Sequence, residues 1–318
     1  MRVLGIDIGG TKTIVGVADQ SGSILAHQRI ETLGSLGPGR AISAIKSACH
    51  DVIAAAGSIE LIGIACGGPL DRRAGTILTV PNLPGWDNMP LVEIFSTEFG
   101  APAFVDNDAA AAALGELDYD AGRGLANFVY FTVSTGIGGG IVIDGRIYRG
   151  HSGNAAEFGH QKILPDGPRC TCGDRGCLES LASGTSIARI AREALSNDTQ
   201  TIIRDWISLP EQITCELVAR AAAAGDSFAS GVWYQAMEHL GLGVSNVVNV
   251  LNPEAVIIGG GVSKAGDLLF DPVRKVVLER SMKPLGEDAA VVPAENGDLT
   301  GLFGAFALAF HEGGHAQK

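Results

Sequence analysis

The sequence has few charged residues, few aromatic residues and no long hydrophobic run. Charged residues make up 18% of the 318-residue chain and aromatic residues 6%. Lys and Arg total 23 against 35 Asp and Glu, so the formal net charge is −12, and the basic residues form no run. A nucleic-acid-binding protein needs a basic surface, which this sequence does not provide. Because no stretch of about 18 apolar residues occurs, we expect no membrane span.

The N-terminal end has no sequence typical of a secretory leader. The apolar stretch 3–6 meets Asp7 at once, which is too short for a signal peptide. We therefore expect a cytoplasmic protein, in which the six cysteines are thiols or metal ligands rather than disulfides. Three of them, Cys49, Cys66 and Cys215, are scattered, and we expect them to be buried thiols.

Glycine, by contrast, is abundant. The chain has 44 glycines, about twice the usual share, and they follow no three-residue period, which excludes collagen. Hydrophobic residues reach 46%, enough apolar surface to exclude disorder. The composition indicates a compact protein with many unusual backbone positions, and the length indicates about two domains.

The apolar pattern predicts an α/β protein with two similar halves. In the first half we expect strands at residues 3–6, 13–18, 24–29, 61–66 and 103–105, and helices at 41–56, 91–99 and 107–117. In the second half we expect strands at 128–133, 139–143, 146–148, 255–258 and 291–292, and helices from about 184 and at 213–224, 228–252, 273–279 and 301–312.

The two halves predict two domains. We place a small α/β domain at 1–117 and a larger one at 118–300, with a C-terminal helix of about 301–318 that packs back on the first. No low-complexity linker separates them, so we expect the ligand cleft to lie between them.

Each half begins with a strand, a glycine-rich turn and another strand. The turns are Asp7-Ile8-Gly9-Gly10-Thr11 and Ser134-Thr135-Gly136-Ile137-Gly138-Gly139-Gly140. Glycine lets successive backbone N–H groups approach an anion, so such turns can hold phosphate groups. Asp7 is placed to bind Mg²⁺, and Thr11 and Thr135 to donate hydroxyl hydrogen bonds. Either turn alone is more simply a hairpin turn, but two at matching positions favour a nucleotide site.

A third glycine cluster, Gly259-Gly260-Gly261, follows the expected strand 255–258. Three glycines allow close backbone approach to a flat ligand such as adenine. A plain strand-to-helix turn is the simpler alternative for this cluster taken alone.

One histidine and three cysteines have the spacing of a metal site. His160, Cys170, Cys172 and Cys177 form the pattern H-x9-C-x-C-x4-C. Three thiolates and one imidazole suit tetrahedral Zn²⁺, and with four protein ligands no position is left for a catalytic water. We therefore expect a structural zinc. A zinc ribbon for nucleic acid is the rival interpretation, which the negative charge and the lack of a second cysteine pair oppose.

Carboxylates near these motifs are candidates for sugar binding and catalysis. Phosphoryl transfer to an alcohol requires a group that accepts the hydroxyl proton, and Asp108 is our candidate. Asp106, Asn107 and Asp108 could each instead cap the helix that follows, and the sequence alone does not choose among them. Glu157 and Glu179 lie close to the metal ligands, where ionised carboxylates can accept hydrogen bonds from sugar hydroxyls.

Taken in order, the motifs resemble those of the ROK family of sugar kinases. They are DIGGTKT, NDAAAAALGE, STGIGGG, EFGH, CTCGDRGCLE and IIGGGV, which run over nearly the whole chain. The resemblance implies the actin-like ATPase (ribonuclease H-like) fold, with a mixed sheet flanked by helices in each domain. It also implies ATP with Mg²⁺, phosphorylation of a hexose, and zinc ligands that match residue for residue.

The resemblance also implies residue roles. Asp108 is the base, and the sugar contacts are Gly68, Asn82, Asn107, Asp108, Glu157, His160 and Glu179. The nucleotide contacts are Asp7, Gly9, Gly10, Thr11, Lys12, Thr135, Gly136, Gly138, Gly259, Gly260 and Gly261. Three positions depart from the family pattern: Gly67 replaces a proline, Ala110 an asparagine and Ala156 a glycine.

We expect a kinase that transfers phosphate from ATP to the 6-hydroxyl of a hexose. The stretch PNLPGWDN (81–88) most resembles the glucokinase members, which favours glucose. Open alternatives are a kinase for N-acetylmannosamine, N-acetylglucosamine or fructose, polyphosphate as donor, and a sugar-sensing regulator. A homodimer is a family expectation.

Overall fold

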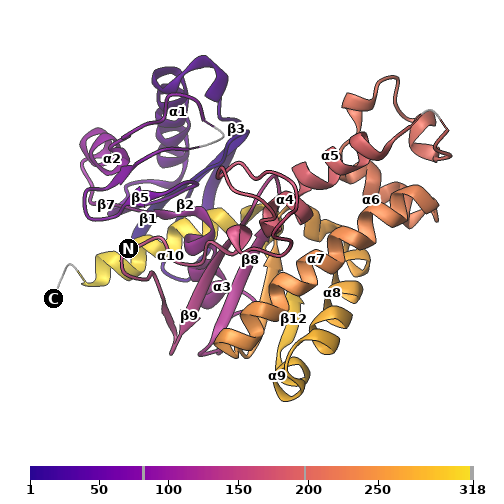
Figure 1. Ribbon diagram of the computed structural model, residues 1–318. Helices are drawn as coiled ribbons and strands as arrows, with labels where there is room; N and C mark the ends of the chain where they lie inside the picture. Colours follow the sequence, from indigo (N-terminus) through magenta and orange to yellow (C-terminus); the bar gives the residue numbers. More distant parts are fainter. Residues whose placement is uncertain (81–82, 197, 316–318) are drawn as a thin grey trace. The chain divides into compact units, whose positions relative to one another are not determined.

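The computed structural model describes residues 1–80, 83–196 and 198–315, which form two compact units (Figure 1). The first unit comprises Met1–Ala126, Gly140–Ala156 and Ala294–Lys318, and the second Asn127–Gly139 and Glu157–Pro293. Among the described residues, no helix combines the length and apolarity that crossing a membrane requires.

The first unit is built on a five-stranded sheet with strand order β3-β2-β1-β4-β7. The strands are β1 (Arg2–Ile8), β2 (Lys12–Asp19), β3 (Ile24–Glu31), β4 (Leu61–Cys66) and β7 (Ala103–Asn107). The helices are α1 (Pro38–Ala56), α2 (Leu91–Phe99), α3 (Asp108–Tyr119) and α10 (Thr300–His315). A separate hairpin pairs β5 (Leu70–Asp71) with β6 (Thr76–Ile77), and short 3₁₀ turns occupy Gly34–Leu36 and Gly297–Leu299.

Strand direction brings residues that are distant in sequence to one edge of this sheet. The strands β1, β4 and β7 run parallel, and Asp7, Ala65 and Asp106 face one another across them in register. The carboxyl ends of parallel strands lie at one edge of a sheet, where ligands bind in α/β folds. The segments that follow Asp7, Cys66 and Asn107 therefore begin at the same edge.

The side chains of β1 point alternately to the two faces of the sheet, and both faces are apolar. Leu4, Ile6 and Ile8 pack in a core with residues of α1 and α2, whereas Val3 packs with Leu302 and Phe306 of α10. Figure 1 shows α1 and α2 on one side of this sheet and α10 on the other. Because both faces are covered, the central strands are apolar on both sides.

Small residues let two helices cross closely on the second face. A side chain at Gly115 of α3 would lie 2.7 Å from the backbone nitrogen of Gly304 in α10. A side chain at Gly304 would in turn collide with the backbone of Ala111. Glycine at these two positions therefore sets the distance between α3 and α10.

The second sheet has the strand order β10-β9-β8-β11-β12, and the division between the two units falls within β9. Its strands are β8 (Phe128–Val133), β9 (Ile137–Ile143), β10 (Arg146–Ile147), β11 (Ala255–Gly259) and β12 (Ala290–Pro293). The helices of the second unit are α4 (Leu178–Ala182), α5 (Gly184–Ala194), α6 (Cys215–Ala223), α7 (Ser227–Leu251), α8 (Asp267–Arg280) and α9 (Lys283–Asp288). Its 3₁₀ turns are Phe158–His160, Ile202–Asp205, Pro210–Gln212 and Gly261–Ala265.

The expected strands and longer helices all occur, with differences at their ends. β9 begins at Ile137 rather than 139, so Gly138, Gly139 and Gly140 lie in a strand and not in the turn before it. α8 begins at Asp267 rather than 273, because Leu269 and Phe270 are buried by the extra turns. The sequence analysis did not predict the β5–β6 hairpin or the short helices α4 and α9.

Candidate functional site

Two aspartates meet at the carboxyl edge of the first sheet. Asp7 is the penultimate residue of β1, and Asp108 opens α3 directly after β7. Asn107 is the N-cap of α3, and its side-chain oxygen accepts from the backbone N–H groups of Ala109 and Ala110. The capping question is thus resolved in favour of Asn107. A side chain at Gly67 would lie 3.5 Å from Oδ2 of Asp108, so the missing proline leaves space beside this carboxylate.

Burial raises the pKa of both aspartates. The pKa of Asp7 rises to about 7, first because burial penalises its charge and second because of the nearby negative charge of Asp108. Burial also raises the pKa of Asp108, although the backbone N–H of Ala109 opposes this by donating to Oδ1 at 2.9 Å. Two neighbouring carboxyl groups that are difficult to ionise at the same time form a site that a proton or a divalent cation would stabilise.

The first glycine turn is closed by backbone and threonine hydrogen bonds. The Gly9 N–H donates to the Lys12 carbonyl at 3.0 Å, and the hydroxyl of Thr32 donates to the Gly9 carbonyl at 2.7 Å. Thr32 also donates its backbone N–H to the carbonyl of Thr11 and pairs with the buried hydroxyl of Thr13 at 3.0 Å. Thr32, a buried residue directly after β3, therefore stabilises the turn by these hydrogen bonds.

The remaining predicted residues of this turn lie at the surface. Gly10 is partly exposed and Thr11 is exposed between β1 and β2. The ammonium of Lys12 lies 3.4 Å from the carboxylate of Asp298, and both side chains are partly exposed. Arg29 also lies within 3.8 Å of that carboxylate. Lys12 is thus held beside the turn by an acidic partner.

Gly68, predicted to contact the sugar, has a backbone conformation that requires glycine. Its φ is +96°, and a side chain there would collide with the carbonyl of Thr79. Asn82, also predicted to contact the sugar, lies outside the described residues.

In the second unit, two predicted nucleotide-binding segments are adjacent. The end of β8 pairs with the end of β11, where Thr132 faces Gly259. Gly260 has a φ of +89°, and a side chain there would lie 2.5 Å from the Val133 carbonyl. A side chain at Gly261 would lie 3.6 Å from the hydroxyl of Ser134. The triple glycine therefore lies against the turn that contains Thr135 and Gly136.

The four predicted zinc ligands come together. One ligand atom each of His160, Cys170, Cys172 and Cys177 can be chosen so that all lie within 4.8 Å of one another. Nδ1 of His160 is 3.6 Å from Sγ of Cys170, and the sulfurs of Cys172 and Cys177 are also 3.6 Å apart. Three sulfurs and one imidazole nitrogen at this spacing fit a four-coordinate zinc.

Lys162 is an additional member of this cluster that the sequence analysis missed. Its ammonium lies 2.9 Å from Sγ of Cys177 and 2.9 Å from the carboxylate of Asp174. A positive charge offsets thiolate charge, so Lys162 suits a site in which three sulfurs bind one Zn²⁺.

Three of the predicted sugar-binding residues, Glu157, His160 and Glu179, lie at the metal cluster. Nε2 of His160 lies 3.9 Å from the carboxylate of Glu157, while its Nδ1 faces the sulfur of Cys170. Glu179 accepts from the Ile137 backbone N–H at 2.9 Å through Oε2 and from the Thr171 hydroxyl at 3.2 Å through Oε1. Glu179 thereby joins the metal loop to the second glycine turn.

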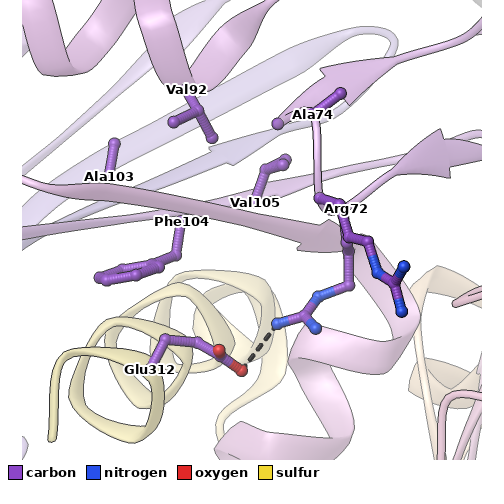
Figure 2. A pocket seen from close by; sticks show the side chains of 9 residues that line it. Arg72, Ala74, Val92, Ala103, Phe104, Val105 and Glu312 are labelled. Atoms are coloured by element: carbon purple, nitrogen blue, oxygen red, sulfur yellow. Dashed lines mark hydrogen bonds and ion pairs between the residues drawn. The ribbon is translucent and has the colours of Figure 1, made fainter. Parts of the chain in front are cut away.

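A cavity of about 270 Å³ lies in the first unit (Figure 2). Its lining comes from the β5–β6 turn, α2, β7 and α10, and includes Arg72, Val92, Phe104 and Glu312. None of its lining residues is a predicted site residue.

Comparison with known proteins identifies the family. The model of the ROK family matches residues 3–312. The chain is 36% identical over 305 residues to a glucokinase of Thermotoga maritima, which covers 92% of this chain and 96% of that protein. It superposes with a TM-score of 0.84 on a Streptomyces griseus ROK family glucokinase solved with glucose and AMPPNP, at 34% identity, covering 98% of this chain and 100% of that chain.

A transcriptional regulator is also similar. The xylose repressor of Caldicellulosiruptor bescii is 36% identical over 220 residues, which cover 69% of this chain but 55% of the repressor. The structural matches confirm the fold that the resemblance implied, with two mixed sheets flanked by helices in the actin-like ATPase class. The chain belongs to the ROK family.

Proposed function

We propose that the protein is a sugar kinase that phosphorylates a hexose at its 6-hydroxyl with ATP, with glucose as the preferred acceptor. The observation that carries this proposal is the half-buried carboxylate of Asp108, which opens α3 beside Asp7 and has a raised pKa. Similarity to proteins named glucokinase over more than nine-tenths of the chain supports the substrate class.

Asp108 accepts the proton of the attacking hydroxyl. A carboxylate whose pKa is raised by burial is a better base than an exposed one. Gly67 places no side chain beside Oδ2 of Asp108, which favours access of a substrate atom to this oxygen. As the proton moves to Asp108, the sugar oxygen becomes a stronger nucleophile toward the terminal phosphate.

Backbone amides hold the donor. In the turn at Gly9, Gly10 and Thr11, the Gly9 N–H donates to the Lys12 carbonyl, and Gly10 and Thr11 supply N–H and hydroxyl donors for phosphate oxygens. The turn at Thr135 and Gly136 supplies donors of the same kind. The triple glycine 259–261 presents a side-chain-free surface for the base. This arrangement binds an anion without the basic surface that the sequence lacks.

Asp7 is suited to hold Mg²⁺, directly or through water. Its half-buried carboxylate lies near that of Asp108, and oxygen ligands are those that Mg²⁺ prefers. When bound, Mg²⁺ neutralises charge on the phosphates. The positive charge of an ion held by Asp7 would allow the carboxyl groups of Asp7 and Asp108 to be ionised at the same time.

The residues proposed to contact the sugar are Asn107, Glu157, His160 and Glu179, together with Gly68 and Asn82. Zn²⁺ held by His160, Cys170, Cys172 and Cys177 is structural, because all four positions are filled by protein atoms. The zinc loop thereby orients the free nitrogen of His160 and the carboxylate of Glu179. We also propose a cytoplasmic homodimer.

A substrate panel tests the proposal. ADP release from MgATP is measured with glucose, mannose, fructose, N-acetylglucosamine and N-acetylmannosamine, and the sugar product is identified by mass. The same panel is repeated with polyphosphate as donor. We expect the highest kcat/KM with glucose and ATP, and the product glucose 6-phosphate. Preference for an N-acetylated sugar or for fructose would reassign the substrate, and absence of transfer to any sugar would reject the kinase.

The similarity to a xylose repressor gives a second candidate, a sugar-sensing regulator. Such a protein would bind sugar without turnover. Sugar binding together with ATP-dependent product formation would exclude it.

A further inference from the structure

Four charged side chains of the first unit form a network of ion pairs that includes Asp106, two residues before the predicted catalytic Asp108. Asp106 is completely buried, and its Oδ2 accepts from Nε of Arg149 at 2.8 Å. Nε of Arg72 lies 3.4 Å from the same oxygen. Both arginines also reach one oxygen of Glu312, at 2.6 Å from Arg72 and 3.3 Å from Arg149. Two cations thus bridge two carboxylates.

The four residues come from four separate segments. Arg72 lies in the turn between β5 and β6, Arg149 follows β10, Asp106 is in β7 and Glu312 is in the last turns of α10. Figure 2 shows Arg72 pointing from its turn to Glu312 on the helix. Asn154 also connects the segments that hold the two arginines: its side-chain oxygen accepts from the Leu70 N–H at 3.1 Å, and its side-chain nitrogen donates to the Leu70 carbonyl at 3.3 Å. The loops that hold the two arginines are therefore joined twice.

Hydrogen bonds lead from this network to Asp108. The second oxygen of Asp106 accepts from the backbone N–H of Asn107 at 2.9 Å. The side chain of Asn107 caps α3, and Asp108 accepts from the next amide, that of Ala109. The orientation of the Asp106 carboxylate therefore constrains the backbone from which Asp108 projects.

Stability alone does not explain such a network. Removing charged groups from water costs free energy that their attraction often fails to return, so buried ion pairs are weak sources of stability. A guanidinium, however, is planar and rigid, so the Asp106 carboxylate, which accepts a hydrogen bond from Arg149 and forms an ion pair with Arg72 at 3.4 Å, has a defined orientation. The geometry favours a role in positioning.

We propose that Arg149, acting through Asp106, is a positioning residue for Asp108, and that Arg72 and Glu312 hold Arg149 in place. This inference rests on the proposed role of Asp108 as the base. The side-chain partners of Arg149 are Asp106 and Glu312, and neither is a predicted site residue. It fixes the peptide between Asp106 and Asn107, and thereby the direction of the Asp108 side chain.

The experiment compares steady-state kinetics of Arg149→Lys, Arg149→Met and Asp106→Asn in the full chain, well below each variant's Tm. Arg149→Lys keeps the charge but loses the planar fork, so its fold should persist. We expect kcat to fall about 10- to 100-fold in Arg149→Lys and Arg149→Met, because an error of about 1 Å at a reacting group costs rate on this scale. KM for ATP should change by less than about threefold, since no phosphate contact is removed.

Lys46→Met is the matched control. It removes a half-buried ion pair with Glu98 in the same unit, 2.8 Å long, that has no path to Asp108. Its kcat should match that of the wild-type chain. An equal loss in this variant would mean that kcat reports general destabilisation, and would overturn the inference.

Two double variants separate positioning from stability. If Arg149 acts through Asp106, the kcat of Arg149→Met/Asp106→Asn should equal that of the slower single variant. In an Asp108→Asn background, Arg149→Met should cause no further loss. Losses that multiply in either double variant would overturn the inference.

Failure of this inference differs from failure of the proposed function. Wild-type activity, an inactive Asp108→Asn variant and unchanged kcat in the Arg149 variants would reject the positioning role alone. Full activity in Asp108→Asn would reject the proposed base, and with it the premise of this inference.

Discussion

The carboxylate of Glu179 accepts a hydrogen bond from the backbone N–H of Ile137, 2.9 Å away. Glu179 follows the last cysteine of the metal cluster by two residues, and Ile137 follows the turn that contains Thr135 and Gly136. A side chain at Gly136 would lie 2.5 Å from the same Glu179 oxygen. One carboxylate thus connects a predicted sugar-binding loop with a predicted phosphate-binding turn.

This connection predicts different outcomes for two substitutions. Glu179→Ala should raise KM for both glucose and ATP, each by about tenfold, since loss of a hydrogen bond to a charged group costs about 1.5–3 kcal/mol. Glu179→Gln retains an acceptor for the Ile137 N–H, so it should raise KM for glucose alone. Steady-state kinetics with each substrate varied check this, with the exposed Glu193→Ala as control. A rise confined to glucose in Glu179→Ala would refute the connection.

Ala156 has the backbone conformation of a glycine. Its φ is +69°, in the left-handed region that favours glycine, at a position where the resembled family has glycine. Ala156→Gly should raise the free energy of unfolding by about 0.5–1 kcal/mol, because relief of the strain exceeds the added chain entropy. Thermal or urea unfolding measures this. Ala155→Gly, at a residue with negative φ, should instead destabilise, and equal destabilisation by both changes would show that Ala156 is not strained.

Glu116 makes stability depend on pH. The residue is fully buried in α3, and its carboxyl oxygens have no hydrogen-bond partner. Burial, and then the charge of Asp120, raise its pKa from 4.5 to about 8. The folded state therefore binds this proton more tightly than the unfolded state. The resulting stabilisation is complete below the unfolded pKa and is lost as the pH rises toward 8.

Glu116→Gln should remove much of this dependence. The wild-type free energy of unfolding should fall between pH 5 and pH 8 relative to that of Glu116→Gln, measured in parallel urea titrations. Glu216→Gln, at an exposed helical position in α6, is the control and should follow the wild-type profile. Parallel profiles for wild type and Glu116→Gln would contradict the prediction.

The cysteine cluster should hold one zinc per chain. Metal analysis of the purified protein tests this directly, and removal by a chelator should lower both Tm and affinity for glucose, because the loop that carries His160 and Glu179 loses its anchor. Cys172→Ser should reproduce the loss, whereas Cys215→Ser, outside the cluster, should retain the zinc. Protein free of zinc, with unchanged glucose affinity, would reject the site.

The sequence was sufficient to predict most secondary structure because the patterns are local. The helix at 91–99 and the strand at 128–133 have the predicted bounds, since apolar spacing marks both and Gly100 directly follows the helix. The zinc cluster was predicted because its ligands lie within 18 residues of one another, and the structure brings them together. The short β5–β6 hairpin lacked such a signal, because two-residue strands have no periodicity.

The charged network was beyond prediction from the sequence. Arg72 and Glu312 are separated by 240 positions, and Arg149 and Asp106 by 43. No spacing rule links such residues; only the packing of α10 and the β5–β6 hairpin on the first sheet brings them together. Thr32, which closes the first glycine turn, was missed for a similar reason, because its partners lie on another strand.

The most direct test of the account is the turnover and sugar binding of Asp108→Asn. We predict that this variant folds and binds glucose with an affinity close to wild type, because Asn107 caps α3 and the other sugar contacts remain. Its kcat should fall by about 10²–10⁴, the usual contribution of a positioned general base. A kcat within threefold of the wild-type value, measured with saturating MgATP and glucose, would contradict the central claim that Asp108 accepts the sugar's proton.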